Sequence, residues 1–155
     1  MAFRISGLSP DPFRHLYGLS DGELARHGAR RYVVDAPHAY PDRIEMRDAA
    51  PGETVLLINH VSQPADTPYR ASHAIFVREG ADQTYSRVDE VPDVMRLRLL
   101  SLRAFDKDGM MLDADVVEGK EIEGVIERLF ANPEVDYIHA HNARRGCYSG
   151  RIDRA

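Results

Sequence analysis

Residues 95–116, MRLRLLSLRAFDKDGMMLDADV, indicate the fold class more clearly than any other stretch. Apolar and polar residues alternate on both sides of Asp106–Gly109, and a period of two residues is typical of β-strands. Asp106–Gly109 has the composition of a tight turn, in which Gly109 can adopt the left-handed backbone conformation. The stretch therefore predicts a β-hairpin, and the chain around it is expected to form an antiparallel sheet.

The first strand of this hairpin changes phase part-way along. Its apolar residues occupy odd positions up to Leu99 and even positions from Leu100 to Ala104. An extra residue in one strand of an antiparallel pair shifts the alternation by one position. We therefore expect a β-bulge near Leu99-Leu100.

Similar patterns predict strands along most of the chain. β-Branched and aromatic residues recur in short runs between segments that contain Gly or Pro, as expected of strands. We expect seven or eight of the candidate strands to form one strongly bent sheet. The candidate strands lie near 3–8, at 31–35, near 44–46, at 54–61, at 72–78, near 84–88, at 95–105, at 112–116, at 135–141 and near 147–153.

Three helices are predicted. The pair Asp11-Pro12 and the capping-box spacing of Ser20 and Glu23 begin two short N-terminal helices. A longer amphipathic helix is expected near 120–131, where apolar residues from Ile122 onwards follow the spacing i, i+3, i+4, i+7 and i+8. Because hairpins outnumber crossover connections, the fold class is α+β with a mostly antiparallel sheet. The 155 residues are expected to form a single domain, 1–155.

Composition excludes several classes of function. The net charge is −5, and no block of like charges forms a nucleic-acid surface. The longest aliphatic run, Val55–Ile58, is far too short to span a membrane, and the N-terminus lacks the apolar core of a signal peptide. Cys147 is the only cysteine, which favours a reducing compartment. We expect a cytoplasmic protein that binds neither nucleic acid nor membrane. No motif identifies a cofactor.

The segment YIHAHNARRGCYSGRI (137–152) concentrates side chains that can carry chemistry. In a strand, His139 and His141 share one face. The face of Cys147 depends on the turn that follows. A four-residue loop that ends before Gly146 places the thiol opposite the histidines, whereas a five-residue loop that includes Gly146 places it beside them. We favour the five-residue loop, because Gly146 suits a left-handed position at the loop end.

Three interpretations of this segment are open. The first is an ordinary strand edge with solvated side chains. The second is a mononuclear metal site, because His139 and His141 can chelate through two imidazoles, with His60 or His73 as a third ligand. The third is an anion site, because guanidinium groups and a free backbone amide near Arg144-Arg145 can bind phosphate or carboxylate.

A second polar segment, NHVSQPADTPYRASH (59–73), joins two predicted strands through a long loop stiffened by prolines. Functional side chains often lie on such loops. We expect the chain to bring both segments together around a small anionic ligand. Histidines can transfer protons near neutral pH, and a thiol beside a histidine can act as a nucleophile. The candidate catalytic residues are His139, His141 and Cys147, and the candidate ligand-binding residues are His60, Tyr69, Arg70, His73, Asn142, Arg144 and Arg145.

Two rival functions are the metal site described above and a non-catalytic interaction protein. In the latter, a sheet edge or the apolar helix face pairs with another subunit, and a homodimer is the simplest form. Neither rival needs an enzymatic activity.

The chain also resembles a family of uncharacterised bacterial proteins of about this length. The resemblance is carried by PGETVLLINH (51–60), TPYRASHAIFVRE (67–79) and YIHAHNARRGCYSGRIDR (137–154). It implies a bacterial cytoplasmic protein, and it assigns no activity or site residue.

Overall fold

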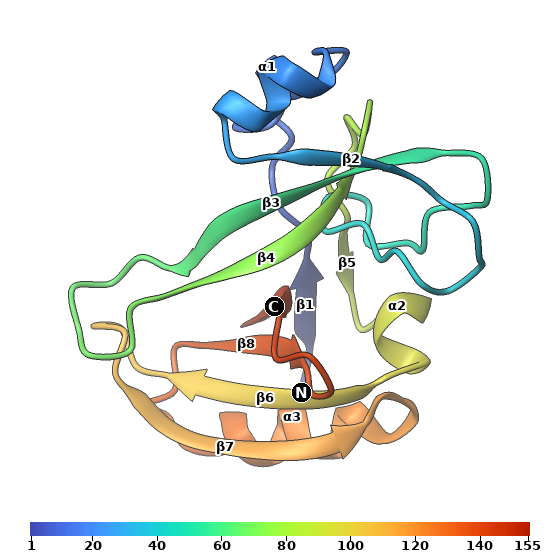
Figure 1. Ribbon diagram of the computed structural model, residues 1–155. Coiled ribbons are helices and arrows are strands. Elements are labelled where there is room, and N and C mark those ends of the chain that lie inside the picture. The colour runs from blue at the N-terminus through green and yellow to red at the C-terminus, as the bar shows by residue number, and fades with distance from the viewer.

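The computed structural model describes residues 1–155 and contains nine strands in two antiparallel sheets (Figure 1). The six-stranded sheet consists of β5 (Ser86–Val88), β1 (Phe3–Ser6), β9 (Tyr148–Arg154), β8 (Tyr137–Asn142), β6 (Leu99–Phe105) and β7 (Met111–Glu118), in that order across the sheet. The three-stranded sheet consists of β2 (Arg30–Val33), β3 (Thr54–Gln63) and β4 (Ala71–Arg78). The predicted α+β class with mostly antiparallel strands is confirmed. The predicted single bent sheet of seven or eight strands is wrong.

The helices are short. They are the 3-10 turns η1 (Arg14–Leu16) and η2 (Gly119–Glu121) and the α-helices α1 (Asp21–Arg26), α2 (Asp93–Arg96) and α3 (Ile122–Phe130). The capping box of α1 is present, since Ser20 Oγ accepts a hydrogen bond from the Glu23 amide at 3.2 Å. Together η2 and α3 cover the predicted long helix. None of the helices is long and apolar enough to span a membrane.

The β6–β7 hairpin forms as predicted, and Gly109 in its turn has a positive φ of 83°. The bulge expected near Leu99-Leu100 is wrong. Met95 belongs to α2, so the change of phase marks the step from helical to strand periodicity, and the register shifts instead between Ala104 and Phe105. A short helical turn that precedes a strand produces the same break in a period of two as a bulge does.

The strand expected near residues 44–46 is absent. A positive φ of 53° at Met46 breaks the extended conformation. The buried Asp42 also bends the segment, because its carboxylate accepts hydrogen bonds from the amides of Glu45 at 2.7 Å and Arg78 at 2.8 Å. This segment is therefore a loop fixed against β4.

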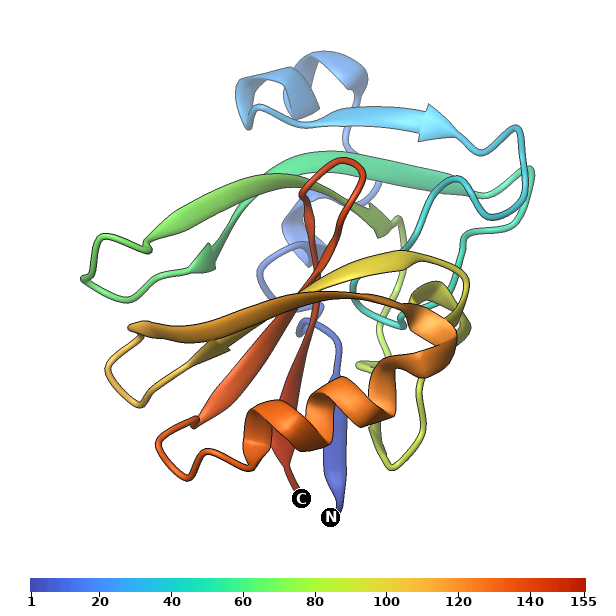
Figure 2. The ribbon, with the colours of Figure 1, turned by 90° about the horizontal axis from the view of Figure 1, so that it is seen from below.

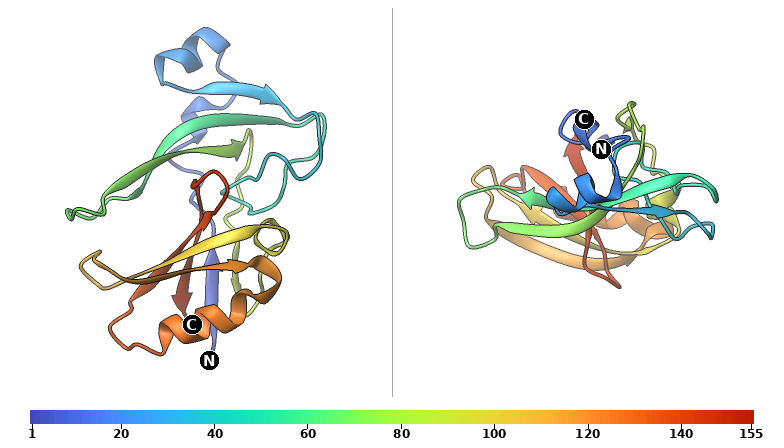
Figure 3. Two further views of the ribbon diagram at one scale, coloured as in Figure 1. Left: turned by 60° about the horizontal axis from the view of Figure 1, so that its bottom comes forward. Right: turned by 45° about the horizontal axis from the view of Figure 1, so that its top comes forward.

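Each face of the six-stranded sheet has its own core. Helix α3 packs on one face, and the three-stranded sheet lies on the other (Figures 2 and 3). The helix side buries Leu100, Leu102, Ile126 and Ile138, among others. On the other side, Tyr148 of β9 joins a cluster that includes Leu56, Ile58, Ile75 and Val77 of the three-stranded sheet. The space between the sheets is thus apolar toward one end of β3 and β4, and their other end carries polar side chains.

Candidate functional site

The two polar segments singled out in the sequence meet between the sheets. His73 of β4 and His141 of β8 lie with ring centroids 4.9 Å apart, and His60 of β3 lies 6.2 Å from the ring of Tyr148. His60 and His73 are also directly paired across β3 and β4. Chain segments about 70 residues apart in sequence therefore contribute to one cluster.

The six-stranded sheet presents ordered rows of side chains to this space. His139 lies between Arg103 of β6 and Arg151 of β9, because both are its cross-strand partners. In the next row, His141 lies between Ser101 of β6 and Tyr148 of β9. We call the histidines and the arginine that face the gap the inter-sheet cluster, which comprises His60, His73, Arg103, His139 and His141.

The histidines of the inter-sheet cluster are held neutral. His139 and His141 are only 4% and 2% exposed. The pKa of His139 is lowered to about 3, mainly by burial and to a smaller extent by the neighbouring His141 and Arg151. Burial is also the main cause that lowers the pKa of His141 to about 4. Burial is also the largest cause that lowers the pKa values of His60 and His73. Near pH 7 the cluster therefore offers uncharged imidazoles.

Hydrogen bonds fix the protonation pattern of one imidazole. The Nδ1 atom of His141 lies 2.9 Å from the carbonyl oxygen of Gly146. A carbonyl only accepts, so Nδ1 of the neutral ring carries the proton and Nε2 carries a free lone pair. In His73, Nδ1 lies 3.1 Å from the hydroxyl of Ser62. The ring of His139 makes no hydrogen bond within the protein.

The two arginines beside His139 differ in their partners. Arg151 donates three hydrogen bonds to Asp153 at 2.9–3.0 Å and lies 4.3 Å from the centroid of the Tyr137 ring. Arg103 is half-buried and donates only to the hydroxyl of Ser101, at 3.3 Å. No carboxylate lies within ion-pair distance of it, and burial lowers its pKa. Arg103 is thus a partly desolvated cation with most of its five donors free.

The C-terminal hairpin corrects the predicted position of the thiol. The loop has four residues between the paired Asn142 and Cys147, and Gly146 at its end has a positive φ of 80°, as expected. The favoured five-residue loop is wrong, and Cys147 lies on the face opposite His141. The alternative four-residue loop, which ends at Arg145 and pairs Gly146 with His141, is not formed either, because His141 pairs with Tyr148. Beyond this pair a bulge at Ser149 reverses the phase of the strand. Sequence spacing cannot reveal such a bulge.

Cys147 contacts groups outside the inter-sheet cluster. Its Sγ accepts a hydrogen bond from the buried Arg43 at 3.1 Å and lies 3.7 Å from Nδ2 of Asn142. Arg43 also donates to the carbonyl oxygens of Pro41 and Tyr148. The Oδ1 atom of Asn142 is buried without a hydrogen-bond partner. The predicted nucleophile Cys147 therefore contacts a buried arginine and does not lie beside an imidazole.

The predicted arginines lie at the edges of the structure. Arg70 is exposed and donates to the carbonyl oxygen of Pro64 in its own loop at 2.6 Å. Arg144 and Arg145 are exposed at the tip of the β8–β9 hairpin and make no hydrogen bond or ion pair. Tyr69 packs edge-on against Phe105, with ring centroids 6.3 Å apart. The arginine that faces the histidines is Arg103, which the sequence pattern did not single out.

A pocket of about 290 Å³ opens beside His139 on the Arg151 side. Ser62 and Gln63 of β3 and Tyr137 of β8 also line it. The Gln63 side chain donates to the Tyr137 hydroxyl at 2.8 Å and closes one wall. The pocket therefore connects His139 with solvent, although this residue is itself buried, and the other members of the inter-sheet cluster do not line it.

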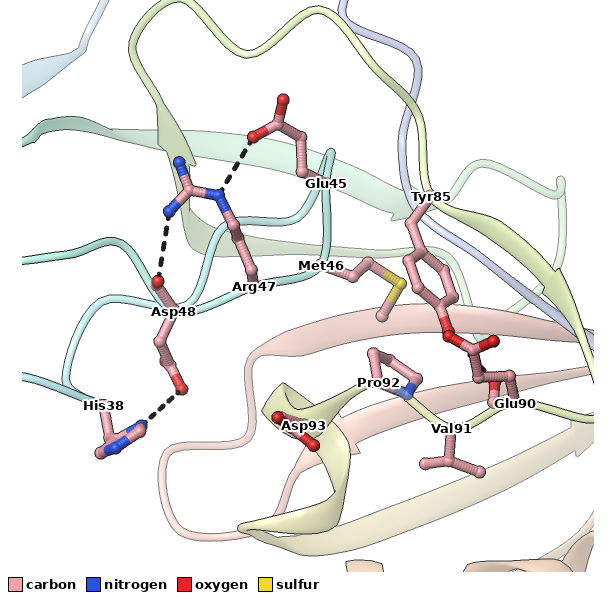
Figure 4. A pocket seen from close by; sticks show the side chains of 10 residues that line it. All are labelled: His38, Glu45, Met46, Arg47, Asp48, Tyr85, Glu90, Val91, Pro92 and Asp93. Carbon is pink, nitrogen blue, oxygen red and sulfur yellow. Dashed lines mark hydrogen bonds and ion pairs between the residues drawn. The ribbon is translucent and has the colours of Figure 1, made fainter.

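A larger pocket of about 440 Å³ lies away from the cluster, beside α2 (Figure 4). Figure 4 shows Arg47 between Glu45 and Asp48, with His38 against Asp48. Asp48 is also paired with Arg98 at 2.7 Å. These charges are matched within the protein, and no predicted site residue lines this pocket, so it does not carry the candidate site.

The metal interpretation gains no support from the geometry. No group of three or more His, Cys, Asp or Glu side chains is arranged to hold a metal ion. His139 and His141 lie on one strand face as expected, but no third ligand converges on them.

Residues 39–154 match the family model described as "Protein of unknown function (DUF1203)". The chain belongs to this family. The resemblance to a family of uncharacterised proteins is thereby confirmed, and the family assigns no activity. Comparisons with curated proteins and with solved structures found no match.

Proposed function

We propose that the protein binds a small anionic molecule at Arg103, with His73 and His141 beside the bound group. The observation that carries the proposal is the half-buried guanidinium of Arg103, whose single partner is the hydroxyl of Ser101. Removing a cation from water is costly unless a partner replaces the lost hydration. A carboxylate or phosphate can do so through two parallel hydrogen bonds from the planar guanidinium.

The neutral imidazoles suit such a ligand. His141 has an unused lone pair at Nε2, since its Nδ1 is bonded to Gly146. That atom can accept a hydrogen bond from a hydroxyl or a protonated oxygen of the ligand. With a pKa of about 4, His141 is a weak base at pH 7, and efficient proton transfer needs a base whose pKa lies near the working pH. The arrangement therefore favours binding over catalysis.

The rival function of strand pairing between subunits is disfavoured at the β7 edge. The side chains of Asp113 and Asp115 accept hydrogen bonds from the amides of Ala114 and Val116, each at 2.8 Å. Arg128 of α3 pairs with both aspartates. Two edge donors that another strand would use are therefore occupied.

We also propose a cytoplasmic location in a bacterium. The single cysteine supports a reducing compartment, because it leaves the chain without an intrachain disulfide, the cross-link that is common in oxidising compartments. The resemblance described above supports the bacterial source.

The proposed binding is tested with the variant R103Q and calorimetric titrations with phosphate and small carboxylates. R87Q is the control, because Arg87 is an exposed arginine on β5, at the opposite edge of the same sheet. Losing hydrogen bonds from a charged group should weaken binding of the active anion by about 10- to 100-fold in R103Q. R87Q should bind as the wild type does. Equal affinity in R103Q and wild type, or no binding of any anion, would contradict the proposal.

A further inference from the structure

Exposed aliphatic side chains gather beside Arg103. Across the β6–β7 pair, Ala114 lies opposite Arg103 and Val116 lies opposite Ser101. Val116 is 56% exposed, and Leu99, two residues before Ser101, is 38% exposed. Because alternate residues of a strand share a face, these side chains lie on the face that carries Arg103. We call Leu99, Ala114 and Val116 the aliphatic strip.

The aliphatic strip is not part of either core. Its neighbours in sequence, Leu100 and Val117, point to the other face and are buried against α3. Leu99 and Val116 are two of the eleven large apolar side chains that remain exposed in the chain, and they are diagonal neighbours across the β6–β7 pair. Neighbouring exposed apolar side chains of this kind can form a surface on which an apolar group binds.

Two charged features restrict what can cover the aliphatic strip. The amides of Ala114 and Val116 are occupied by aspartate side chains, so a β-strand of another chain cannot pair along this edge. At the far end of the strip, Glu118 lies opposite Leu99, while the unpaired cation Arg103 lies at the near end. A ligand with one anionic group is attracted at Arg103 and repelled at Glu118.

From these contacts we infer that the ligand of the proposed anion site is a carboxylate with an aliphatic chain. The inference rests on the proposed function, because it uses Arg103 as the anchor of the carboxylate. The chain extends from Arg103 along Ala114 and Val116 toward Leu99. Four residues of strand separate Arg103 from Leu99, or about 13 Å, which suits a chain of medium length such as that of decanoate.

Affinity as a function of chain length tests this inference. Acetate, butyrate, octanoate and decanoate are titrated by calorimetry below their micelle concentrations, with decanol as an uncharged comparison. Full burial of a methylene strengthens binding about fourfold, so a strip that covers one side of the chain gives about twofold per methylene. We therefore expect decanoate to bind roughly 60-fold more tightly than butyrate.

Surface variants assign the effect to the strip. V116S combined with L99S should remove most of the chain-length dependence and leave acetate binding unchanged. V88S is the matched control, because Val88 is a 44% exposed valine on the opposite edge strand of the same sheet. R103Q should weaken every carboxylate by a similar factor.

The outcomes separate the two proposals. If short anions bind through Arg103 and affinity does not rise with chain length, the aliphatic-chain inference is overturned and the anion site stands. The aliphatic-chain inference is also overturned, and the anion site stands, if the V116S/L99S variant keeps the full dependence of affinity on chain length. If no carboxylate and no phosphate binds, both proposals fail. If decanol binds as tightly as decanoate, the strip binds apolar chains without the help of Arg103, which overturns the inference.

Discussion

Replacing His139 by phenylalanine should reduce the amount by which acid lowers the free energy of unfolding. His139 is 4% exposed, makes no hydrogen bond through its ring, and lies 5.0–5.2 Å from the aromatic rings of Tyr137, Phe105 and Tyr148. A phenylalanine ring suits these neighbours and cannot take up a proton. H139F is therefore expected to fold and to remain as stable as the wild type near pH 7.5.

The magnitude follows from the difference in pKa between the folded and unfolded states. The unfolded-state pKa of histidine is about 6.5, and in the folded protein it is about 3 for His139 and about 4 for His141. Between these pH values the unfolded state binds more protons than the folded state does. The free energy of unfolding therefore has its full value above about pH 6.5 and decreases as the pH falls. From pH 7.5 to pH 5.0 each histidine should remove about 2 kcal/mol, or about 4 kcal/mol together.

The measurement is urea unfolding at several pH values between 5.0 and 7.5. The wild type should lose about 4 kcal/mol over this range from His139 and His141. The lowered pKa values of His60 and His73 add to this loss, whereas the raised pKa of the buried Asp42 opposes it. H139F should lose about 2 kcal/mol less. The lower limit avoids the acidic pH at which Glu53 and Glu79, whose pKa values are lowered to about 2 by their arginine partners, begin to lose their contribution.

The control is H15F, which removes an exposed histidine and should leave the wild-type loss unchanged. If H139F and the wild type lose the same free energy between pH 7.5 and pH 5.0, His139 is not buried in its neutral form. The electrostatic description of the inter-sheet cluster would then be wrong.

Two further predictions concern the sheet edge and the glycines near it. G119A should lower the melting temperature strongly, because a Cβ would overlap the carbonyl oxygen of Met95, whereas G124A has open space and should stabilise α3 by about 1 kcal/mol. A smaller effect of G119A than of G124A in thermal unfolding would contradict the packing of η2 against α2. D113A combined with D115A frees the edge amides of β7, so sedimentation should reveal concentration-dependent self-association that the wild type lacks. A monomeric double variant would refute the protective role of these aspartates.

The sequence predicted the local elements better than their assembly. Ser20 and Glu23 identified α1, and the turn at Gly109 identified the β6–β7 hairpin, because both signals depend on neighbours in sequence. The division into two sheets depends on which strands pair at long range. No local pattern shows that β1 pairs with β9 at the other end of the chain.

The candidate site was also predicted only in part, because it too depends on contacts between distant parts of the chain. His73 and His141 meet, as expected of two polar segments at strand ends. Arg103 was overlooked because an arginine that alternates with leucines is typical of a solvent-facing strand position. Its importance comes from the missing carboxylate, which only the three-dimensional structure can reveal.

Nitrogen NMR of the labelled protein tests most directly whether Arg103 and the neighbouring histidines bind the anion. The free protein should show His141 as the tautomer protonated at Nδ1. Addition of the anion that binds in calorimetry should shift the Nε signal of Arg103 and the ring nitrogens of His73 and His141, and leave the Nε signal of Arg87 in place. Shifts confined to other arginines, with these three side chains unchanged, would contradict the proposed site.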